Sequence, residues 1–255
     1  MAYNNIILET KNGITRLTID RPPVNVMDRA TLGEMCDAFG KLAKDDTRVL
    51  LIRGAGEKAF CAGVEVGDHV GDTMPVMMKE FGKMFRLLRG LGKPSIAVVN
   101  GIALGGGCEL VLGCDLAIAS DKAKLGQPEI ILGGLAPVAA PLLPRILGEK
   151  KAFEMLLLGG TMTAADAERF GLVNKVVPID ELDAAAEALA GQFLKISPLS
   201  VKLVRDAFYA CAEIPDFNKA LDKAVELGIG SWSTEDGQEG LKAYLEKRSP
   251  VWKNR

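Results

Sequence analysis

The chain has few aromatic residues, few cysteines and a single histidine. Aromatic residues make up 5% of its 255 residues, so an aliphatic interior is expected. The five cysteines are odd in number and show no CxxC or finger-like spacing, so neither a disulfide framework nor a zinc site is indicated, and no metal is expected. His69 lies in a polar stretch and is interpreted as a solvated loop residue, which leaves a histidine-based triad with little support.

The chain also lacks an excess of charge of one sign and any long apolar run. A formal net charge of -2 gives no broad cationic field for nucleic acid or an anionic membrane. The longest uncharged runs, 94–108 and 130–144, are too short to span a bilayer and are broken by glycine or proline. The first 13 residues lack the pattern of a signal peptide. We therefore expect a cytoplasmic protein with no membrane and no nucleic-acid partner.

Strand and helix patterns alternate along the first part of the chain. Asn12-Gly13 between the apolar runs 6–8 and 14–19 predicts a β-hairpin. Asp28 can cap a helix whose apolar residues recur at helical spacing up to Leu42. Strands are expected at 49–52, 95–99 and near 116–119, with helices over about 74–91 and through Glu109. Repeated units of strands and helix predict an α/β fold.

The last part of the chain is expected to be helical. Helices at 151–158 and 163–170 precede a final strand at 172–177. After it the pattern predicts only helices, roughly over 180–194, 198–212, 215–228 and 235–247, with a break at Gly228-Ile229-Gly230. We divide the chain into an α/β core over 1–190 and a helical region over 191–255, without a flexible linker between them.

A glycine triplet, Gly105-Gly106-Gly107, precedes a short apolar helix. The first N–H groups of such a helix have no intrahelical acceptor and can bind a negative oxygen. A second turn, at 60–64, also follows a strand, and two such turns can direct donors at one oxygen. The alternative is a pair of tight turns with no ligand. A phosphate loop is disfavoured because neither GxGxxG nor GxxxxGK[ST] is present.

Two glutamates, Glu109 and Glu129, stand next to these turns in the sequence. Glu109 lies in an otherwise apolar helix, where it either complements the helix dipole or faces a pocket. Glu129 has no basic residue near it between Lys124 and Arg145, so its pKa is expected to be raised. Alone, Glu129 is an ordinary loop carboxylate. Together, two carboxylates can divide proton uptake and donation, which the addition of water beside a carbonyl requires.

Two further features are interpreted as packing. The apolar stripe of the helix over 74–91, which includes Met77 and Phe81, is typical of a core face, although methionine also suits the wall of an acyl pocket. Cys61 and Cys108 adjoin the expected pocket but have no basic partner nearby in the sequence. We therefore treat both cysteines as small apolar packing residues.

Several segments together resemble the enoyl-CoA hydratase/isomerase, or crotonase, superfamily. They run nearly from end to end of the chain: 21–26 (RPPVNV), 59–65 (AFCAGVE), 100–110 (NGIALGGGCEL), 127–129 (QPE), 171–177 (GLVNKVV) and the tail over 239–250. The resemblance implies a crotonase-like spiral of ββα units with a helical C-terminal trimerisation region. It also implies a homotrimer, or a homohexamer built from two trimers.

The resemblance further implies an acyl-CoA thioester substrate, with coenzyme A as part of that substrate and no separate cofactor. It assigns Glu109 and Glu129 as the catalytic acids, and the backbone N–H groups of Val64 and Gly106 as the oxyanion hole. The remaining residues that it assigns to binding of the substrate or coenzyme A are Val24, Val26, Ala62, Gly63 and Gly105, with the adenine end at the main chain around Val24 and Val26.

Both acids are present, and this favours an enoyl-CoA hydratase. The alternatives are a double-bond isomerase and a non-catalytic, RNA-binding or scaffold member of the superfamily. One segment departs from the hydratase pattern: Pro137 to Arg145 is shorter and more apolar than the usual PGAGGTQRLPR-like run. In this respect the chain resembles the cyclic dienoyl-CoA hydratases of aromatic compound breakdown. An alicyclic substrate such as cyclohexa-1,5-diene-1-carbonyl-CoA is therefore predicted, in place of a straight fatty acyl chain.

Overall fold

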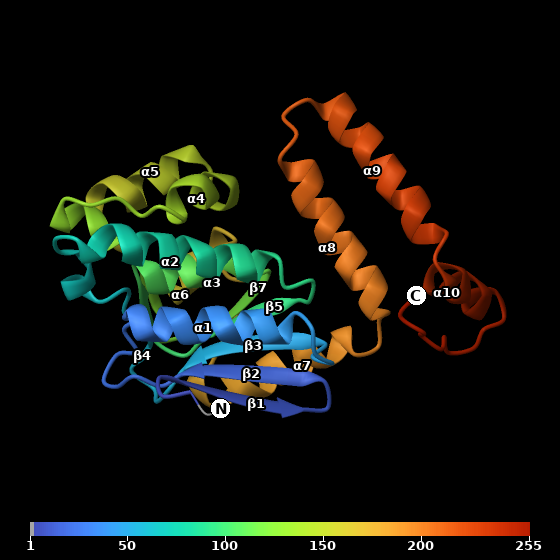
Figure 1. Ribbon diagram of the computed structural model, residues 1–255, viewed down its shortest axis with the longest axis horizontal. Helices are drawn as coiled ribbons and strands as arrows, with labels where there is room; N and C mark the ends of the chain where they lie inside the picture. Colours follow the sequence, from blue (N-terminus) through green and yellow to red (C-terminus); the bar gives the residue numbers. More distant parts are fainter. Residues whose placement is uncertain (1–2) are drawn as a thin grey trace.

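The computed structural model describes residues 3–255 and contains two β-sheets (Figure 1). The larger sheet has the strand order β1-β2-β3-β5-β7-β10, and every neighbouring pair in it is parallel except the β1–β2 hairpin. The hairpin predicted at Asn12-Gly13 is confirmed, because Asn12 and Gly13 both take positive φ and join the paired strands. The strands are β1 (Ile6–Lys11), β2 (Ile14–Ile19), β3 (Val49–Gly54), β5 (Ser95–Val99), β7 (Leu116–Ser120) and β10 (Lys175–Val177).

The second sheet consists of four strands of three residues each, in the order β4-β6-β8-β9. Strands β4, β6 and β8 follow β3, β5 and β7 after short connections, so the chain passes from the larger sheet to the smaller one three times. Helices return it to the larger sheet, which gives the predicted spiral of ββα units. The bounds are β4 (Ala59–Cys61), β6 (Ile102–Leu104), β8 (Lys124–Gly126) and β9 (Thr161–Thr163).

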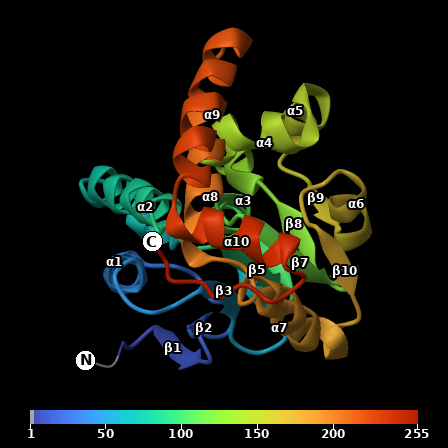
Figure 2. The same cartoon turned by 90° about the vertical axis from the view of Figure 1, so that its right-hand side faces the viewer.

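Helices cover both faces of the larger sheet (Figure 2). Side chains alternate along β3, so that Leu50 and Ile52 face the main core, while Val49 and Leu51 face α7 (Leu182–Phe193). The main core lies under α1 (Arg29–Leu42), α2 (Thr73–Arg89) and α3 (Gly106–Gly113). Helix α1 begins at the predicted cap, since the Asp28 carboxylate accepts the N–H of Thr31 at 2.8 Å.

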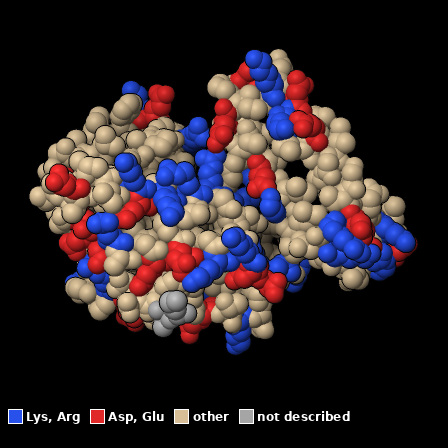
Figure 3. All heavy atoms as spheres, in the orientation of Figure 1, with Lys and Arg blue, Asp and Glu red and all other residues tan. Residues whose placement is uncertain are grey.

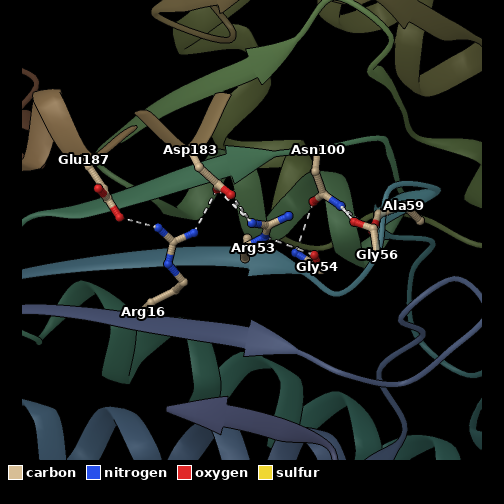
Figure 4. Close-up of polar contacts among 8 residues, drawn as sticks. All are labelled: Arg16, Arg53, Gly54, Gly56, Ala59, Asn100, Asp183 and Glu187. Atoms are coloured by element: carbon tan, nitrogen blue, oxygen red, sulfur yellow. Dashed lines mark hydrogen bonds and ion pairs between the residues drawn. The ribbon is translucent and has the colours of Figure 1, made fainter. Parts of the chain in front are cut away.

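Ion pairs fasten α7 to the strands beneath it (Figure 4). Arg53 on β3 donates to both oxygens of Asp183, at 2.8 and 2.6 Å. Arg16 on β2 donates to Asp183 at 2.8 Å and to Glu187 at 3.0 Å. Because both carboxylates are more than half exposed, these pairs fix the position of α7 more than they stabilise the fold.

A buried asparagine at the end of β5 holds the passage from β3 to β4 (Figure 4). Asn100 accepts the N–H of Gly54 at 3.2 Å and donates to the carbonyl oxygens of Gly56 and Ala59 at 2.8 and 3.2 Å. It therefore sets where β4 starts, and with it the turn that leads to Val64.

The last three long helices form an arm that projects from the body (Figure 1). They are α8 (Pro198–Ala212), α9 (Phe217–Trp232) and α10 (Glu235–Leu245). The buried Arg205 guanidinium docks α8 on the body: its Nε lies 2.8 and 2.9 Å from the two oxygens of Asp115, and Tyr209 donates to the same carboxylate at 2.8 Å. Within residues 3–255, no helix is both long enough and apolar enough to cross a bilayer.

The structure corrects several sequence-based boundaries. The break predicted at Gly228-Ile229-Gly230 is wrong, because α9 continues to Trp232; each glycine costs only about 1 kcal/mol in a helix, and a long helix can accommodate it. The final strand covers 175–177 and not the predicted 172–177. The helix predicted at 151–158 is α5 (Glu149–Leu158), and the one predicted at 163–170 is α6 (Ala164–Arg169). An additional helix, α4 (Ala139–Leu147), precedes them. Helix α4 was not predicted because it contains Pro141 and Pro144.

Candidate active site

The glycine triplet begins the predicted short helix, α3, and follows the short strand β6. Gly105 has a φ of +51° and donates its N–H to the Gly126 carbonyl oxygen at 2.9 Å. The N–H of Gly106 is in the first turn of the helix and has no intrahelical acceptor. A Cβ atom on Gly105 would lie 2.8 Å from Oε1 of Glu129, so a larger residue would displace that carboxylate, and the positive φ also favours glycine here.

The second turn presents the N–H of Val64 in the same region. Met27 donates to the Gly63 carbonyl oxygen at 2.8 Å and accepts the N–H of Glu65 at 2.9 Å, which forms a parallel bridge. Successive residues of an extended segment direct their N–H groups to opposite sides, so the N–H of Val64 points away from Met27.

The two turns are in contact with each other. A Cβ atom on Gly63 would lie 3.2 Å from the Leu104 carbonyl oxygen and 3.8 Å from the nitrogen of Gly106. Cγ2 of Val64 lies 2.8 Å from the position of a Cβ on Gly106. The two turns therefore lie against each other, and the direction of their N–H groups toward one oxygen stays a prediction.

Glu109 is buried one turn further along α3, with 1% of its surface exposed. Its Oε1 accepts the N–H groups of Val138 and Ala139 at 2.6 and 2.8 Å. These residues begin α4, whose own first residues provide no side-chain cap, so Glu109 caps that helix from outside. Burial raises the pKa of Glu109 to about 7, although the two backbone N–H groups oppose the rise.

Glu129 lies in a short 3-10 helix, η2 (Pro128–Leu132), and is less buried. Burial raises its pKa, as the sequence predicts. The amide of the buried Gln127 faces both oxygens of Glu129; with its nitrogen assigned to that side, as the neighbouring acceptors require, it donates to them at 3.2 and 3.1 Å. These contacts hold the Glu129 carboxylate at the edge of the glycine turn.

The two carboxylates influence each other. The charge of Glu129 contributes to the raised pKa of Glu109, and both charges add to the effect of burial in raising the pKa of the Cys108 thiol. Both acids also lie against Gly105: its carbonyl oxygen accepts the N–H of Glu109 at 2.8 Å, and a Cβ atom on it would lie 2.8 Å from Oε1 of Glu129, so the structure brings the two acids to the same turn. A carboxyl group with a pKa near neutrality can both give and accept a proton there.

His69 is exposed, as predicted, but its position near the acids was not predicted. Its Nδ1 lies 3.0 Å from the Glu65 carbonyl oxygen in a 3-10 helix, η1 (Val66–His69), which directly follows the Val64 turn. Burial raises the pKa of Glu129, and a positive charge on His69 would oppose that rise, which places the ring near the carboxylate. His69 and Glu129 are far apart in the sequence, so their proximity could not be predicted from it.

The segment predicted to bind coenzyme A runs alongside the Val64 turn. The carbonyl oxygen of Val24 accepts the N–H of Ala62 at 3.0 Å, and that of Val26 accepts a hydrogen bond from Arg21 at 3.0 Å. Asn25, with a φ of +56°, is buried between them. Both valines are half-buried, and their role in binding coenzyme A stays a prediction.

The packing interpretation of the remaining candidates agrees with the structure. Cys61 and Cys108 are fully buried, and burial raises the pKa of both thiols, to about 12 for Cys61. Met77 and Phe81 are buried in the main core. Among residues 3–255, no group of three or more His, Cys, Asp or Glu side chains is arranged to hold a metal ion.

Known proteins resemble the chain over almost its whole length. The profile of the enoyl-CoA hydratase/isomerase family matches residues 9–255. A crotonyl-CoA hydratase of Syntrophomonas wolfei is 38% identical, with 97% of each chain covered, and a short-chain-enoyl-CoA hydratase of Clostridium acetobutylicum is 37% identical with the same coverage. The crystal structure of an enoyl-CoA hydratase from Bacillus anthracis superimposes with a TM-score of 0.94 at 31% identity, covering 99% of this chain and 100% of the other. The chain therefore belongs to the enoyl-CoA hydratase/isomerase family.

Proposed function

We propose that the protein is an enoyl-CoA hydratase that adds water across the α,β double bond of an acyl-CoA thioester. The observation that carries this proposal is the placement of Glu109 and Glu129 in one site beside the N–H groups of Val64 and Gly106. The names of the relatives, which include crotonyl-CoA hydratase and short-chain-enoyl-CoA hydratase, support the same activity.

In the proposed reaction, the thioester oxygen binds to the N–H groups of Val64 and Gly106. One water molecule is held between Glu109 and Glu129. Its oxygen bonds to the β-carbon while a carboxylate takes its proton, and negative charge develops on the thioester oxygen, where the two N–H donors stabilise it. Protonation of the α-carbon completes the addition. Water is the only other reactant, and coenzyme A enters as part of the substrate.

The proposal is tested by replacing each acid in turn. Glu109→Gln and Glu129→Gln should each reduce hydration of crotonyl-CoA by about 10²- to 10⁴-fold, measured as loss of the absorbance of the conjugated thioester. Glu57→Gln, in an exposed turn before β4, is the matched control and should leave the rate unchanged. Near wild-type rates for both site variants would show that the two-acid mechanism is wrong.

We propose that the acyl group is alicyclic. The segment from Pro137 to Arg145 differs from the usual hydratase sequence, and it contains the residues that begin α4 beside Glu109. The relatives' names point instead to crotonyl and other short chains. Turnover of cyclohexa-1,5-diene-1-carbonyl-CoA should exceed that of crotonyl-CoA if the substrate is alicyclic. A strong preference for crotonyl-CoA overturns this part of the proposal.

Two other activities are distinguished by their products and ligands. A double-bond isomerase would give a shifted double bond and no hydroxyacyl-CoA, which analysis of the products detects. An RNA-binding or scaffold protein would retain RNA in a salt-dependent manner and would not bind coenzyme A thioesters. The raised pKa values of Glu109 and Glu129 favour an enzyme over a binding protein, because they suit proton transfer, and the presence of two acids favours the hydratase over the isomerase.

We further propose that the arm joins copies of the chain into a trimer or hexamer. Apolar residues recur every four positions along α9 at Phe217, Leu221, Val225 and Ile229, and all of them are exposed. Uncharged atoms also dominate the surface over α4 and α5, where Phe153 and Leu157 are exposed (Figure 3). A stripe of this length is typical of a surface that another chain covers.

Light scattering tests this assembly. The wild-type mass should be three or six times the 27.2 kDa of one chain. Ile229→Glu should lower that mass, whereas Lys219→Glu, at an exposed position of α9 outside the apolar stripe, should not. A wild-type monomer, or an unchanged mass for Ile229→Glu, would contradict the proposal.

A further inference from the structure

Helix α3 approaches α2 through two glycines that share one face. Gly106 and Gly113 are seven residues apart, which places them on the same side of the helix. A Cβ atom on Gly106 would lie 3.2 Å from Cε2 of Phe81, and one on Gly113 would lie 2.7 Å from Cδ1 of Phe85. The two aromatic rings of α2 therefore contact opposite ends of α3.

The two rings are similar in chemistry but differ in what they contact. Phe81 and Phe85 are one turn apart on α2 and pack edge to face, with centroids 4.9 Å apart. Phe85 meets the last residue of α3, far from the glycine turn. Phe81, only 2% exposed, meets the first residue of α3, which Val64 contacts from another direction.

Helix α3 has only eight residues, and the position of its first N–H depends on what its first turn packs against. Gly106 has no side chain with which to pack, so this side of the first turn is contacted by the Phe81 ring and the Val64 methyl group. A hydrogen-bond donor that stabilises developing charge must be placed within a fraction of an ångström, since a shift of about 1 Å can reduce the rate roughly 10²-fold.

We propose that Phe81 is a positioning residue for the oxyanion hole, which holds the N–H of Gly106 in line with that of Val64. This inference rests on the proposed hydratase function. Phe81 does not touch the reacting atoms in this account. It acts through the first turn of α3, while Phe85 serves only to pack the far end of the same helix.

The comparison of Phe81→Leu with Phe85→Leu tests the inference. Each variant replaces one ring of the Phe81–Phe85 pair with an aliphatic side chain, so both variants lose the contact between the two rings. We expect kcat for crotonyl-CoA to fall roughly 10- to 100-fold in Phe81→Leu with a much smaller change in KM, and to stay within about threefold of wild type in Phe85→Leu. Thermal unfolding monitors the stability of both variants.

A spectroscopic measurement separates donor placement from general packing. A chromophoric enoyl thioester such as 4-dimethylaminocinnamoyl-CoA absorbs at longer wavelength when donors polarise its carbonyl. The red shift on binding should be reduced in Phe81→Leu and retained in Phe85→Leu. If Phe81→Leu fails to fold, Phe81→Met, which fills more of the space with a flexible side chain, is assayed in the same way.

Each outcome decides the question. Equal losses in the two variants, or a wild-type red shift in the Phe81 variant, overturn the inference, even though the wild-type protein hydrates its substrate. If the wild-type protein neither hydrates enoyl-CoA thioesters nor shifts the absorbance of the probe, the proposed function itself fails. The two failures are therefore distinguishable.

Discussion

Replacement of Glu109 by glutamine should stabilise the protein at alkaline pH while it impairs the reaction. Glu109 is 1% exposed, and burial raises its pKa from the ordinary value of 4.5 to about 7. Between these two pH values the native protein binds the proton more tightly than the unfolded chain does. Stability from this group is therefore fully present below pH 4.5 and is lost as the pH rises through 7.

The size of the effect follows from the two pKa values. A rise from 4.5 to about 7 corresponds to about 3 kcal/mol in the free energy of unfolding. Glutamine has no charge to desolvate, and its Oε1 can still accept the N–H groups of Val138 and Ala139. We expect Glu109→Gln to match the wild type near pH 4.5 and to exceed it by about 3 kcal/mol at pH 8.

Urea denaturation at pH 5, 6, 7 and 8 and one fixed protein concentration measures this difference, with Glu57→Gln as the exposed control. The difference between Glu109→Gln and wild type should grow from pH 5 to 7 and then level off, whereas the control should show no such trend. A difference that is constant across the series, or a variant less stable than wild type at pH 8, would refute the explanation by burial.

Three further substitutions test the supports of the site. Gly105→Ala, at a φ of +51° and with its methyl group 2.8 Å from Glu129 Oε1, should cost about 1–3 kcal/mol and most of the hydration activity, measured by denaturation and a crotonyl-CoA assay. Asn100→Ala should cost about 1–3 kcal/mol by leaving the groups of the β3–β4 passage unpaired, and should reduce kcat. Arg205→Met leaves the Asp115 carboxylate without its cation and should destabilise the docked arm by about 3–5 kcal/mol, seen as faster proteolysis of α8.

Local patterns in the sequence were sufficient for much of the fold. The Asn12-Gly13 hairpin, the Asp28 cap and the repeat of strands and helices depend on neighbours within a few residues, and all three are present. The family motifs added the spiral order, which periodicity alone does not give. The second sheet was not predicted from the sequence, because a strand of three residues is too short to show an alternating pattern.

The hydrogen bonds that hold Glu109 could not be predicted from the sequence, for a different reason. The partners of Glu109 are backbone N–H groups about thirty residues away, in a segment whose two prolines argue against a helix. Every residue except proline has such a group, so no side-chain pattern marks it. The proximity of His69 to Glu129 likewise depends on the path of the chain between them and not on either residue type.

The hydrogen bonds from backbone N–H groups explain how the segment from Pro137 to Arg145 can differ from the usual hydratase sequence while Glu109 stays in place. Glu109 binds α4 through main-chain N–H groups, which Val138 and Ala139 provide as well as glycine or a polar residue would. The side chains of the segment can then vary without loss of these two hydrogen bonds. If the proposed hydratase function holds, the composition of Pro137 to Arg145 should affect the choice of acyl group more than the addition of water, because the contacts to Glu109 come from the main chain.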